Sequence, residues 1–133
     1  MSEPLEIGAT TTLDGTVPPA RTAAALATDS EKLPPVFGTP FMIADMERAC
    51  AVLLSPLLGP DDVSVGARIE VSHNAPTPEG ATVRAGARFT GREGPLYWFD
   101  VWAEDGGGTI GEGRIARAIL PEGKLISRAE KRR

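Results

Sequence analysis

The sequence predicts an α+β domain in which one buried helix packs against an antiparallel sheet. One long, mostly apolar helical segment spans about residues 40–54. Most of the chain after residue 60 alternates between apolar and polar or small residues, which is the period of two that strands show. Hairpin-length turns join the last three of these segments, so they should be antiparallel. This is an α+β layer arrangement, although the pattern alone does not separate one helix-on-sheet fold from another.

The composition is that of one ordinary globular domain. With 133 residues, of which 41% are apolar and 24% charged, the chain can form a single hydrophobic core, so we expect one domain over residues 1–133. Its net charge of −4 argues against a nucleic-acid partner. The basic end of the chain, about residues 122–133, is expected to be a solvated tail.

The amino terminus and the hydropathy of the chain bear on its location. Residues 1–12 lack the basic segment and apolar run of a signal peptide. No stretch approaches the roughly 18 apolar residues that span a bilayer. We therefore expect a cytoplasmic protein with no membrane partner. The one cysteine, Cys50, lies among small apolar residues and is expected to be a buried hydrophobe rather than a nucleophile.

The expected elements follow one another in the order strand, long connection, helix and four strands. The first strand is expected over residues 4–17. A connection rich in Pro, Ala and Thr follows over residues 17–35, with one short helical turn around residues 23–27, and long connections of this kind tend to be functional or mobile. The later strands are expected at residues 63–73, 81–89, 96–103 and 109–120.

The central helix has clear signals at its start. Thr39 is the expected N-cap, and Pro40 suits the first helical position, where its missing N–H costs nothing. Pro56 ends the helix. Asp45 and Arg48 supply a short polar edge and most other positions are apolar, so we expect a helix that is buried on most sides.

Two charged or titratable residues stand among apolar neighbours. Glu47 lies roughly opposite Asp45 on the helix, where it either reaches past the helix edge and pairs with an arginine or serves as a catalytic carboxylate in a partly dry pocket. His73, the one histidine, continues the apolar face of its strand, formed by Val63, Val65, Ala67, Ile69 and Val71. It is either a hydrogen-bonded structural residue or a general base at a pocket mouth.

Thr39 and Arg117 are further candidates. A hydroxyl at a helix N-terminus can cap the helix or contact a reacting carboxylate, and the backbone N–H groups there favour negative charge. Arg117 shares its strand parity with Ile115 and Ile119, so it points toward the core side. An ion pair, or a contact with a phosphate or carboxylate, is required there.

Several familiar sites are missing from the sequence. It has no phosphate-binding loop of the G-x-x-x-x-G-K-S/T type, no H-E-x-x-H pair and no serine nucleophile elbow. One histidine and one cysteine make a transition-metal site improbable, so we expect no metal and no other cofactor.

Three ordered stretches of the chain resemble the fluoroacetyl-coenzyme A thioesterase family and its hot-dog-fold relatives. They are VFGTPFM at residues 36–42, MERAC at residues 46–50 and VSHNAPTP at residues 71–78. The resemblance extends over roughly residues 7–120, and it includes the spacing of eight residues from Thr39 to Glu47 and twenty-six from Glu47 to His73. Any one stretch is a weak signal, but the ordered set is fairly specific.

The resemblance implies a hot-dog fold and a homodimer with active sites at the subunit interface. It implies a catalytic set of Thr39, Glu47 and His73. Glu47 would be the nucleophile or the carboxylate that orients water, His73 the general base and acid, and Thr39 a hydrogen-bond partner of Glu47 or of the reacting centre. The backbone of Gly66 would lie close to the thioester carbonyl, and Arg117 would lie near the substrate.

One position departs from the family pattern. The family carries a phenylalanine near the end of the long connection that helps to gate a dry pocket, and Leu33 stands there in this chain. Phe37 matches a different family position. Both are expected to contact the substrate, and the acyl group is left open.

The resemblance therefore favours a hydrolase of a short acyl-CoA thioester that needs no cofactor beyond the CoA of its substrate. Two other functions fit a similar pocket. One is a non-catalytic protein that binds an acyl-CoA or a similar ligand, and the other is an acyl-CoA hydratase or dehydratase, which also uses an acid–base pair.

Overall fold

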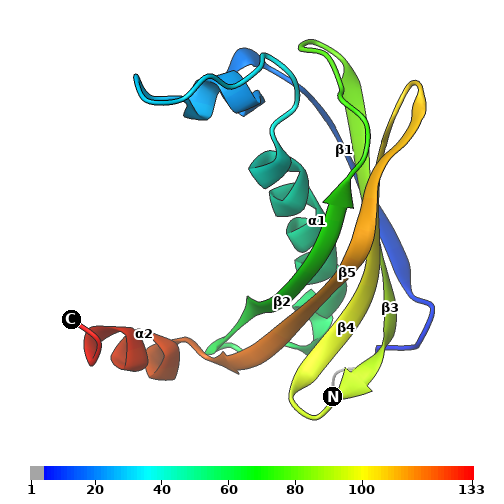
Figure 1. Cartoon of the computed structure of the whole chain (residues 1–133). Helices are drawn as coiled ribbons and strands as arrows, with labels where there is room; N and C mark the ends of the chain where they lie inside the picture. Colours follow the sequence, from blue (N-terminus) through cyan, green and yellow to red (C-terminus); the bar gives the residue numbers. More distant parts are fainter. Residues whose placement is uncertain (1–4) are drawn as a thin grey trace.

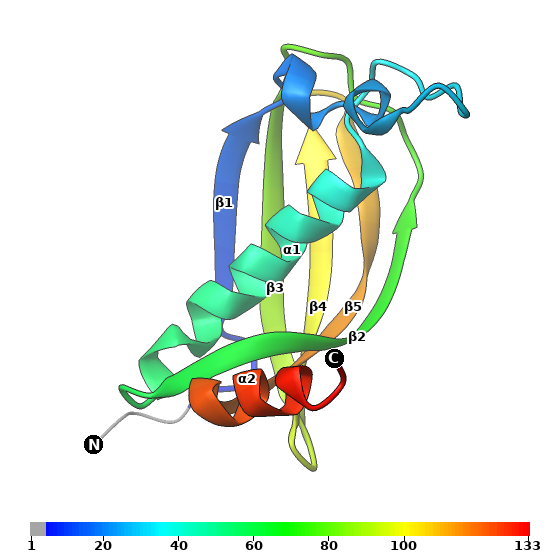
Figure 2. The same ribbon diagram turned by 90° about the vertical axis from the view of Figure 1, so that its left-hand side faces the viewer.

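One helix, α1 (Thr39–Leu54), lies across the concave face of a five-stranded sheet (Figures 1 and 2). The computed structural model describes residues 5–133. Every pair of neighbouring strands is antiparallel, and the spatial order is β1-β3-β4-β5-β2, so the predicted α+β arrangement is confirmed. The strands are β1 (Thr10–Thr16), β2 (Asp62–His73), β3 (Thr82–Glu93), β4 (Leu96–Asp105) and β5 (Gly108–Pro121).

The expected strand and helix positions agree with the structure, apart from the two ends of the chain. The first strand is shorter than predicted: it begins at Thr10, and residue 4 of the predicted range lies outside the described residues. The long connection holds two short 3-10 helices, η1 (Pro19–Arg21) and η2 (Ala23–Leu26), the second at the predicted helical turn. A third, η3 (Ser55–Leu57), follows α1.

The basic end of the chain is a helix, α2 (Glu122–Glu130), where a solvated tail was expected. The tail prediction was wrong about structure and right about exposure, because Leu125 alone among residues 122–133 is partly covered. Pro121 precedes the helix in an extended conformation and Glu122 supplies an acidic side chain in the first turn, where the helix dipole favours negative charge.

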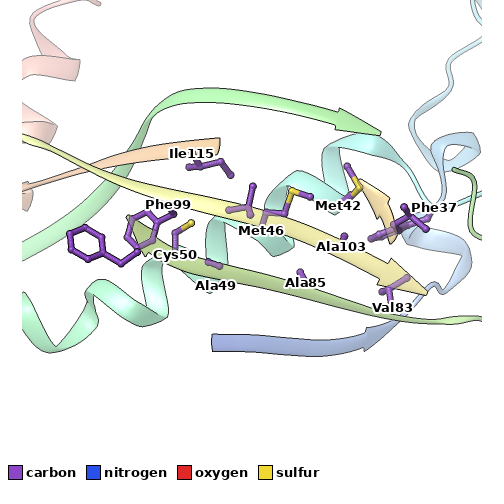
Figure 3. Close-up of a cluster of buried hydrophobic side chains, with 14 of the residues drawn as sticks. Phe37, Met42, Met46, Ala49, Cys50, Val83, Ala85, Phe99, Ala103 and Ile115 are labelled. Atoms are coloured by element: carbon purple, nitrogen blue, oxygen red, sulfur yellow. The ribbon is translucent and has the colours of Figure 1, made fainter. Parts of the chain in front are cut away.

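The core lies between α1 and the middle strands of the sheet, as Figure 3 shows. The helix buries one stripe of side chains at intervals of three and four residues, which is the spacing of a single helical face. Against this stripe pack Ala85, Phe99 and Ile115 from three successive strands. The buried helix residues are Met42, Met46, Ala49, Cys50 and Leu54.

The opposite side of α1 is open, so the expectation of a helix buried on most sides was wrong for the single chain. Ala44 and Arg48 are exposed, and Val52 is 48% exposed although it is a large apolar residue. The sheet curves around only one side of the helix (Figure 2).

A β-bulge in β2 corrects the predicted alternation of that strand. The pairing with β5 shifts between Gly66 and Arg68, so Ala67 is the extra residue and strand parity changes there. Gly66 pairs with Arg117 and Ile69 pairs with Ile115. The face that His73 shares with Ile69 and Val71 therefore continues through Gly66 and Ser64, and not through Val63, Val65 and Ala67 as the sequence pattern suggested.

Within residues 5–133, no helix combines the length and the apolar character needed to cross a membrane.

Candidate active site

The start of α1 meets the end of β2 through a direct hydrogen bond. Thr39 Oγ1 lies 2.8 Å from His73 Nδ1, across 34 residues of sequence. The N-cap of α1 is Gly38, with no side-chain cap, and Thr39 is the first helical residue. The expectation that Thr39 caps the helix was therefore wrong, and its hydroxyl is free to orient the imidazole. The other ring nitrogen, Nε2, is buried and has no hydrogen-bond partner in the described part of the chain.

Gly111 explains how the helix comes this close to the strand. It pairs with His73 across the ladder between β2 and β5. A Cβ atom at this position would approach the Met42 side chain to 2.8 Å and the Ser72 carbonyl oxygen to 2.7 Å, both closer than real contacts allow. The missing side chain at Gly111 lets the first turns of α1 approach β5, which brings Thr39 to His73.

A hollow of about 370 Å³ opens beside this pair. Phe37, which is 2% exposed, contributes to its wall, together with Thr39 and His73. Leu33 is 37% exposed and does not belong to the lining, although its neighbour Pro34 does. The remaining wall comes from the long connection and the segment after β2: Ala23, Val36, Asn74, Ala75 and Pro76.

Glu47 lies two turns further along α1, in a second hollow of about 220 Å³. Its side chain is 30% exposed, and Oε1 lies 3.8 Å from Nη1 of Arg117. At that distance the two groups form an ion pair, but they are too far apart for a hydrogen bond. No hydrogen bond to the Glu47 carboxylate forms among residues 5–133, so its partly buried oxygens are available to a ligand.

Arg117 is held in place by β2 and not by Glu47. Its guanidinium donates to the Ser64 carbonyl oxygen at 2.8 Å and to Ser64 Oγ at 3.2 Å. The residue is 8% exposed, and a buried guanidinium requires such partners. The prediction that Arg117 points to the core side and meets a carboxylate is confirmed in its geometry.

Gly66 leaves room for the carboxylate. It pairs with Arg117 in the ladder, and a Cβ atom added to Gly66 would collide with Glu47 Oε1. A larger residue here would displace the Glu47 side chain from the hollow. Glu47, Gly66 and Arg117 therefore form one cluster, as Thr39 and His73 form another.

The structure holds these two clusters apart within one chain. Eight residues of helix separate Thr39 from Glu47, which is about 12 Å along the axis. The two residues also line different hollows. The reacting carbonyl group of a thioester is much smaller than this separation, so it cannot contact both clusters of the same chain. The prediction that Glu47 and His73 meet therefore depends on how chains associate.

Arg21 was not singled out from the sequence, yet it fixes the connection that precedes Thr39. Its guanidinium pairs with Asp45 of α1 at 2.6 Å and lies over the rings of Phe37 and Phe41, at 5.3 and 5.9 Å from their centroids. Its backbone carbonyl accepts from the Gly38 N–H at 3.1 Å. An arginine 24 positions from its carboxylate gives no local sequence pattern that could reveal the pair.

Cys50 lies on the buried stripe of α1 and takes no part in either cluster. Burial raises the pKa of its thiol to about 12, which keeps the sulfur protonated and poorly nucleophilic. The prediction of an inert, buried cysteine is confirmed. Within the described residues, no group of three or more His, Cys, Asp or Glu side chains is arranged to hold a metal ion.

With this geometry in view, the chain can be compared with known proteins. The family model of the fluoroacetyl-CoA-specific thioesterases matches residues 17–123, which include every residue of both clusters. A fluoroacetyl-CoA thioesterase from Streptantibioticus cattleyicolor is 37% identical over 123 residues, covering 90% of this chain and 88% of that protein. The chain belongs to this family.

Solved structures agree with this assignment. A structure of a fluoroacetyl-CoA thioesterase superposes with a TM-score of 0.92 at 34% identity, over 98% of this chain and 99% of that one. A thioesterase superfamily member from Thermus thermophilus superposes with a TM-score of 0.86 at 29% identity, over 97% and 96% of the two chains. The predicted hot-dog fold and the predicted thioester hydrolase class are confirmed by these family members. A hydrolase is favoured over the binding protein and the hydratase that the sequence left open.

Proposed function

We propose that the protein hydrolyses a short acyl-CoA thioester at a site that two subunits build together. In this site, Glu47 of one subunit faces Thr39 and His73 of the other. The observation that carries the proposal is the separation of the two clusters within one chain, because each cluster is well formed and neither is complete alone.

The free edge of β2 supports association through this strand. β2 is an outer strand of the sheet, and its 12 residues have no strand partner on the far side in the described chain. Long unpaired edges are templates for pairing with another chain. The middle of this edge also carries Ile69, a large apolar residue that is 48% exposed.

A two-fold axis near Ile69 would bring the clusters together. Two β2 strands related by such an axis pair antiparallel, and Arg68 of each strand then faces Glu70 of the other, so opposite charges meet. The same register places His73 of the partner subunit opposite Val65, beside Gly66. Glu47 and Arg117 lie on the inner side of the sheet at that point, next to the incoming imidazole.

The chemistry of hydrolysis follows from the residues. Water supplies an OH to the acyl carbon and a proton to the sulfur, as the carbon–sulfur bond breaks. His73 can take the proton from the attacking group and return it to the departing thiolate, and its bond to Thr39 fixes the ring for both steps. Arg117 and the backbone at Gly66 lie where negative charge develops on the carbonyl oxygen.

Two routes are open to the Glu47 carboxylate. It attacks the carbonyl carbon itself and forms an anhydride that water then cleaves, or it draws a proton from a water molecule that attacks directly. A single turnover in ¹⁸O-labelled water separates direct attack by water from an anhydride that water cleaves at the Glu47 carbonyl carbon. The anhydride route leaves the label in the Glu47 side chain, and direct attack by water places it in the acid product.

The size of the hollow at Glu47, about 220 Å³, supports a small acyl group. The wall of the larger hollow carries Phe37, and Leu33 lies just outside it on the long connection. We propose that these two side chains cover the acyl group when substrate is bound.

The proposal is tested by thiol release from a panel of short and medium acyl-CoA esters. We expect hydrolysis of the shortest esters, and we expect Glu47→Gln and His73→Ala to lower kcat by about 10²–10⁴, the range for lost acid–base groups. Glu93→Gln, which removes an exposed carboxylate from the end of β3, away from both hollows, is the matched control. If wild type cleaves no ester, or if both site variants retain its rate, the proposed function is wrong.

A further inference from the structure

The charges of this protein are divided between an acidic body and a basic end. Residues 122–133 hold five basic and two acidic side chains, a net charge of +3, which leaves −7 for residues 1–121 out of the total of −4. A body of that sign repels a polyanion such as the nucleotide part of CoA. Any attraction for such a ligand has to come from local groups of cations.

Most cations of the body are already paired. Of the nine arginines and lysines in residues 1–121, six form ion pairs with carboxylates. Of the five in residues 122–133, only Arg133 pairs with a carboxylate of the described residues, Glu130 at 2.9 Å. The cations without a carboxylate partner among residues 5–133 are therefore concentrated in and just after α2.

These cations share one side of α2. Lys124, Arg128, Lys131 and Arg132 are spaced by four, three and one residues, which places them along one stripe of a helix. Helical hydrogen bonds continue past Glu130, because the Arg132 N–H donates to the Ala129 carbonyl and the Arg133 N–H to that of Glu130. An adjoining stripe is apolar and carries Leu125 and Ala129.

The helix starts beside the beginning of β2. Asp62 pairs with Pro121, and the Glu122 N–H donates to the Asp61 carbonyl at 2.9 Å. Figures 1 and 2 show α2 on the side of the sheet that α1 covers. Gly66 is four residues from Asp62 along β2, which is about 13 Å at 3.3 Å per residue. The extended pantetheine arm of CoA spans a comparable distance.

We propose that α2 binds the phosphate groups of the CoA part of the substrate, through Lys124 and Arg128 with help from the cations that follow. This inference rests on the proposed function, because it assumes that the thioester lies at Gly66 and Glu47. The pantetheine arm then follows β2 toward α2, and the charged nucleotide reaches the basic stripe.

The groups at the base of α2 support this direction. A hollow of about 400 Å³ there is lined by Asp61, Asp62 and Glu122. Three carboxylates cannot hold a phosphate, but they can accept hydrogen bonds from the neutral amide and hydroxyl groups of pantetheine. The phosphates must therefore lie beyond this hollow, where the first cation is Lys124.

The test is a calorimetric titration of the full-length protein with CoA and with pantetheine, which lacks the nucleotide and its phosphates. We expect Lys124→Gln/Arg128→Gln to weaken CoA binding at least fivefold and to leave pantetheine binding unchanged. The loss should shrink as ionic strength rises, because salt screens exposed charges. In turnover assays, KM for the acyl-CoA should rise while kcat stays the same.

The matched control is Arg88→Gln/Arg92→Gln, which removes the same two charges from β3. The α2 proposal is overturned if the variant of α2 binds CoA as tightly as wild type, if it loses CoA and pantetheine equally, or if the control loses CoA equally. A wild-type protein that binds no CoA overturns the proposed function as well. Binding of CoA by wild type with no effect of the α2 variant overturns the α2 proposal alone.

Discussion

The two clusters on α1 differ in how far one chain completes them. Thr39 and His73 are joined by a hydrogen bond of 2.8 Å, so folding alone sets the geometry of this half. Glu47 has only a 3.8 Å ion pair with Arg117, and its carboxylate receives no hydrogen bond from the described residues. The Thr39 and His73 cluster, the finished half of the site, is therefore positioned before substrate arrives. The cluster of Glu47, Gly66 and Arg117, the open half, still has a carboxylate free to bind a ligand.

The protein gives up stability for function at the Glu47 carboxylate. A partly buried carboxylate without a hydrogen bond is unfavourable for folding, and such groups are kept at sites that act on ligands. Arg117 shows the opposite treatment, because its Nε and Nη2 groups donate hydrogen bonds to Ser64. Perturbing the open half should therefore alter catalysis more than folding.

Substitution of Gly66 should have the largest effect on the open half. In Gly66→Ala the new methyl group collides with Glu47 Oε1, so the carboxylate must move out of its hollow. We expect kcat to fall by about 10²-fold, the scale of a misplaced catalytic group. The unfolding temperature should change little, because the group that must move is the end of the Glu47 side chain, which is 30% exposed. Steady-state thiol release and thermal unfolding measure the two effects.

The control is Gly106→Ala in the turn between β4 and β5, where an added Cβ meets nothing within 4 Å. Retention of the wild-type rate by Gly66→Ala would show that Glu47 does not act from its observed position.

The finished half depends on the pair between Arg21 and Asp45. Both side chains are partly buried, with 26% and 14% exposure. Asp45→Asn removes the charge partner and should cost about 1–2 kcal/mol of unfolding free energy. It should lower kcat less than tenfold, because the connection that carries Phe37 loosens while Thr39 and His73 remain. Urea unfolding and thiol release test this.

An exposed pair supplies the comparison for Asp45→Asn. Asp14 and Arg84 are 71% and 51% exposed, and Asp14→Asn should have an effect near zero. Equal losses of stability in the two variants would mean that the Arg21 pair holds nothing in place.

An effect confined to alkaline pH is the loss of stability from Cys50, which lies on the buried stripe of α1. The thiol has a folded pKa of about 12, raised by burial above its ordinary value of 9.0. Its contribution is complete below pH 9 and is lost as the pH rises toward 12, because the unfolded chain ionises first. At most, about 1.4 kcal/mol disappears per pH unit in that range. In Cys50→Ala, the unfolding free energy should lack this part of the decline with pH. The prediction is contradicted if the unfolding free energies of the variant and wild type fall with the same slope between pH 9 and 10.5.

Local patterns predicted most of the fold. The helix was expected at residues 40–54 and lies at Thr39–Leu54, and the four later strands are each within a few residues of their predicted ranges. Those signals are short in range: period-two alternation, a proline near the helix start and glycine-rich turns. They act between neighbours, so a single sequence displays them directly.

The features that were missed depend on contacts between distant residues. In the sequence, Ala67 continues the apolar alternation of its strand, so nothing there indicates a bulge. Only the pairing of β2 with β5 reveals the shift in register at this residue. The Thr39 hydroxyl bonds to a partner 34 residues away, which no local pattern reveals. From the sequence, its place at the helix start therefore indicated only a cap. The family resemblance placed Glu47, Gly66 and Arg117 each near the substrate, and the contacts that join them in one cluster lie beyond any local pattern. Their catalytic roles stay predictions.

The most direct measurement of the central claim is complementation between two inactive variants. Glu47→Ala and His73→Ala are unfolded together, refolded as a mixture and assayed for thiol release. If each site takes Glu47 from one subunit and His73 from the other, every mixed dimer contains one intact site, and activity should return to about a quarter of wild type. If Glu47 and His73 act within one chain, no intact site can form, and a mixture as inactive as its components would contradict the account.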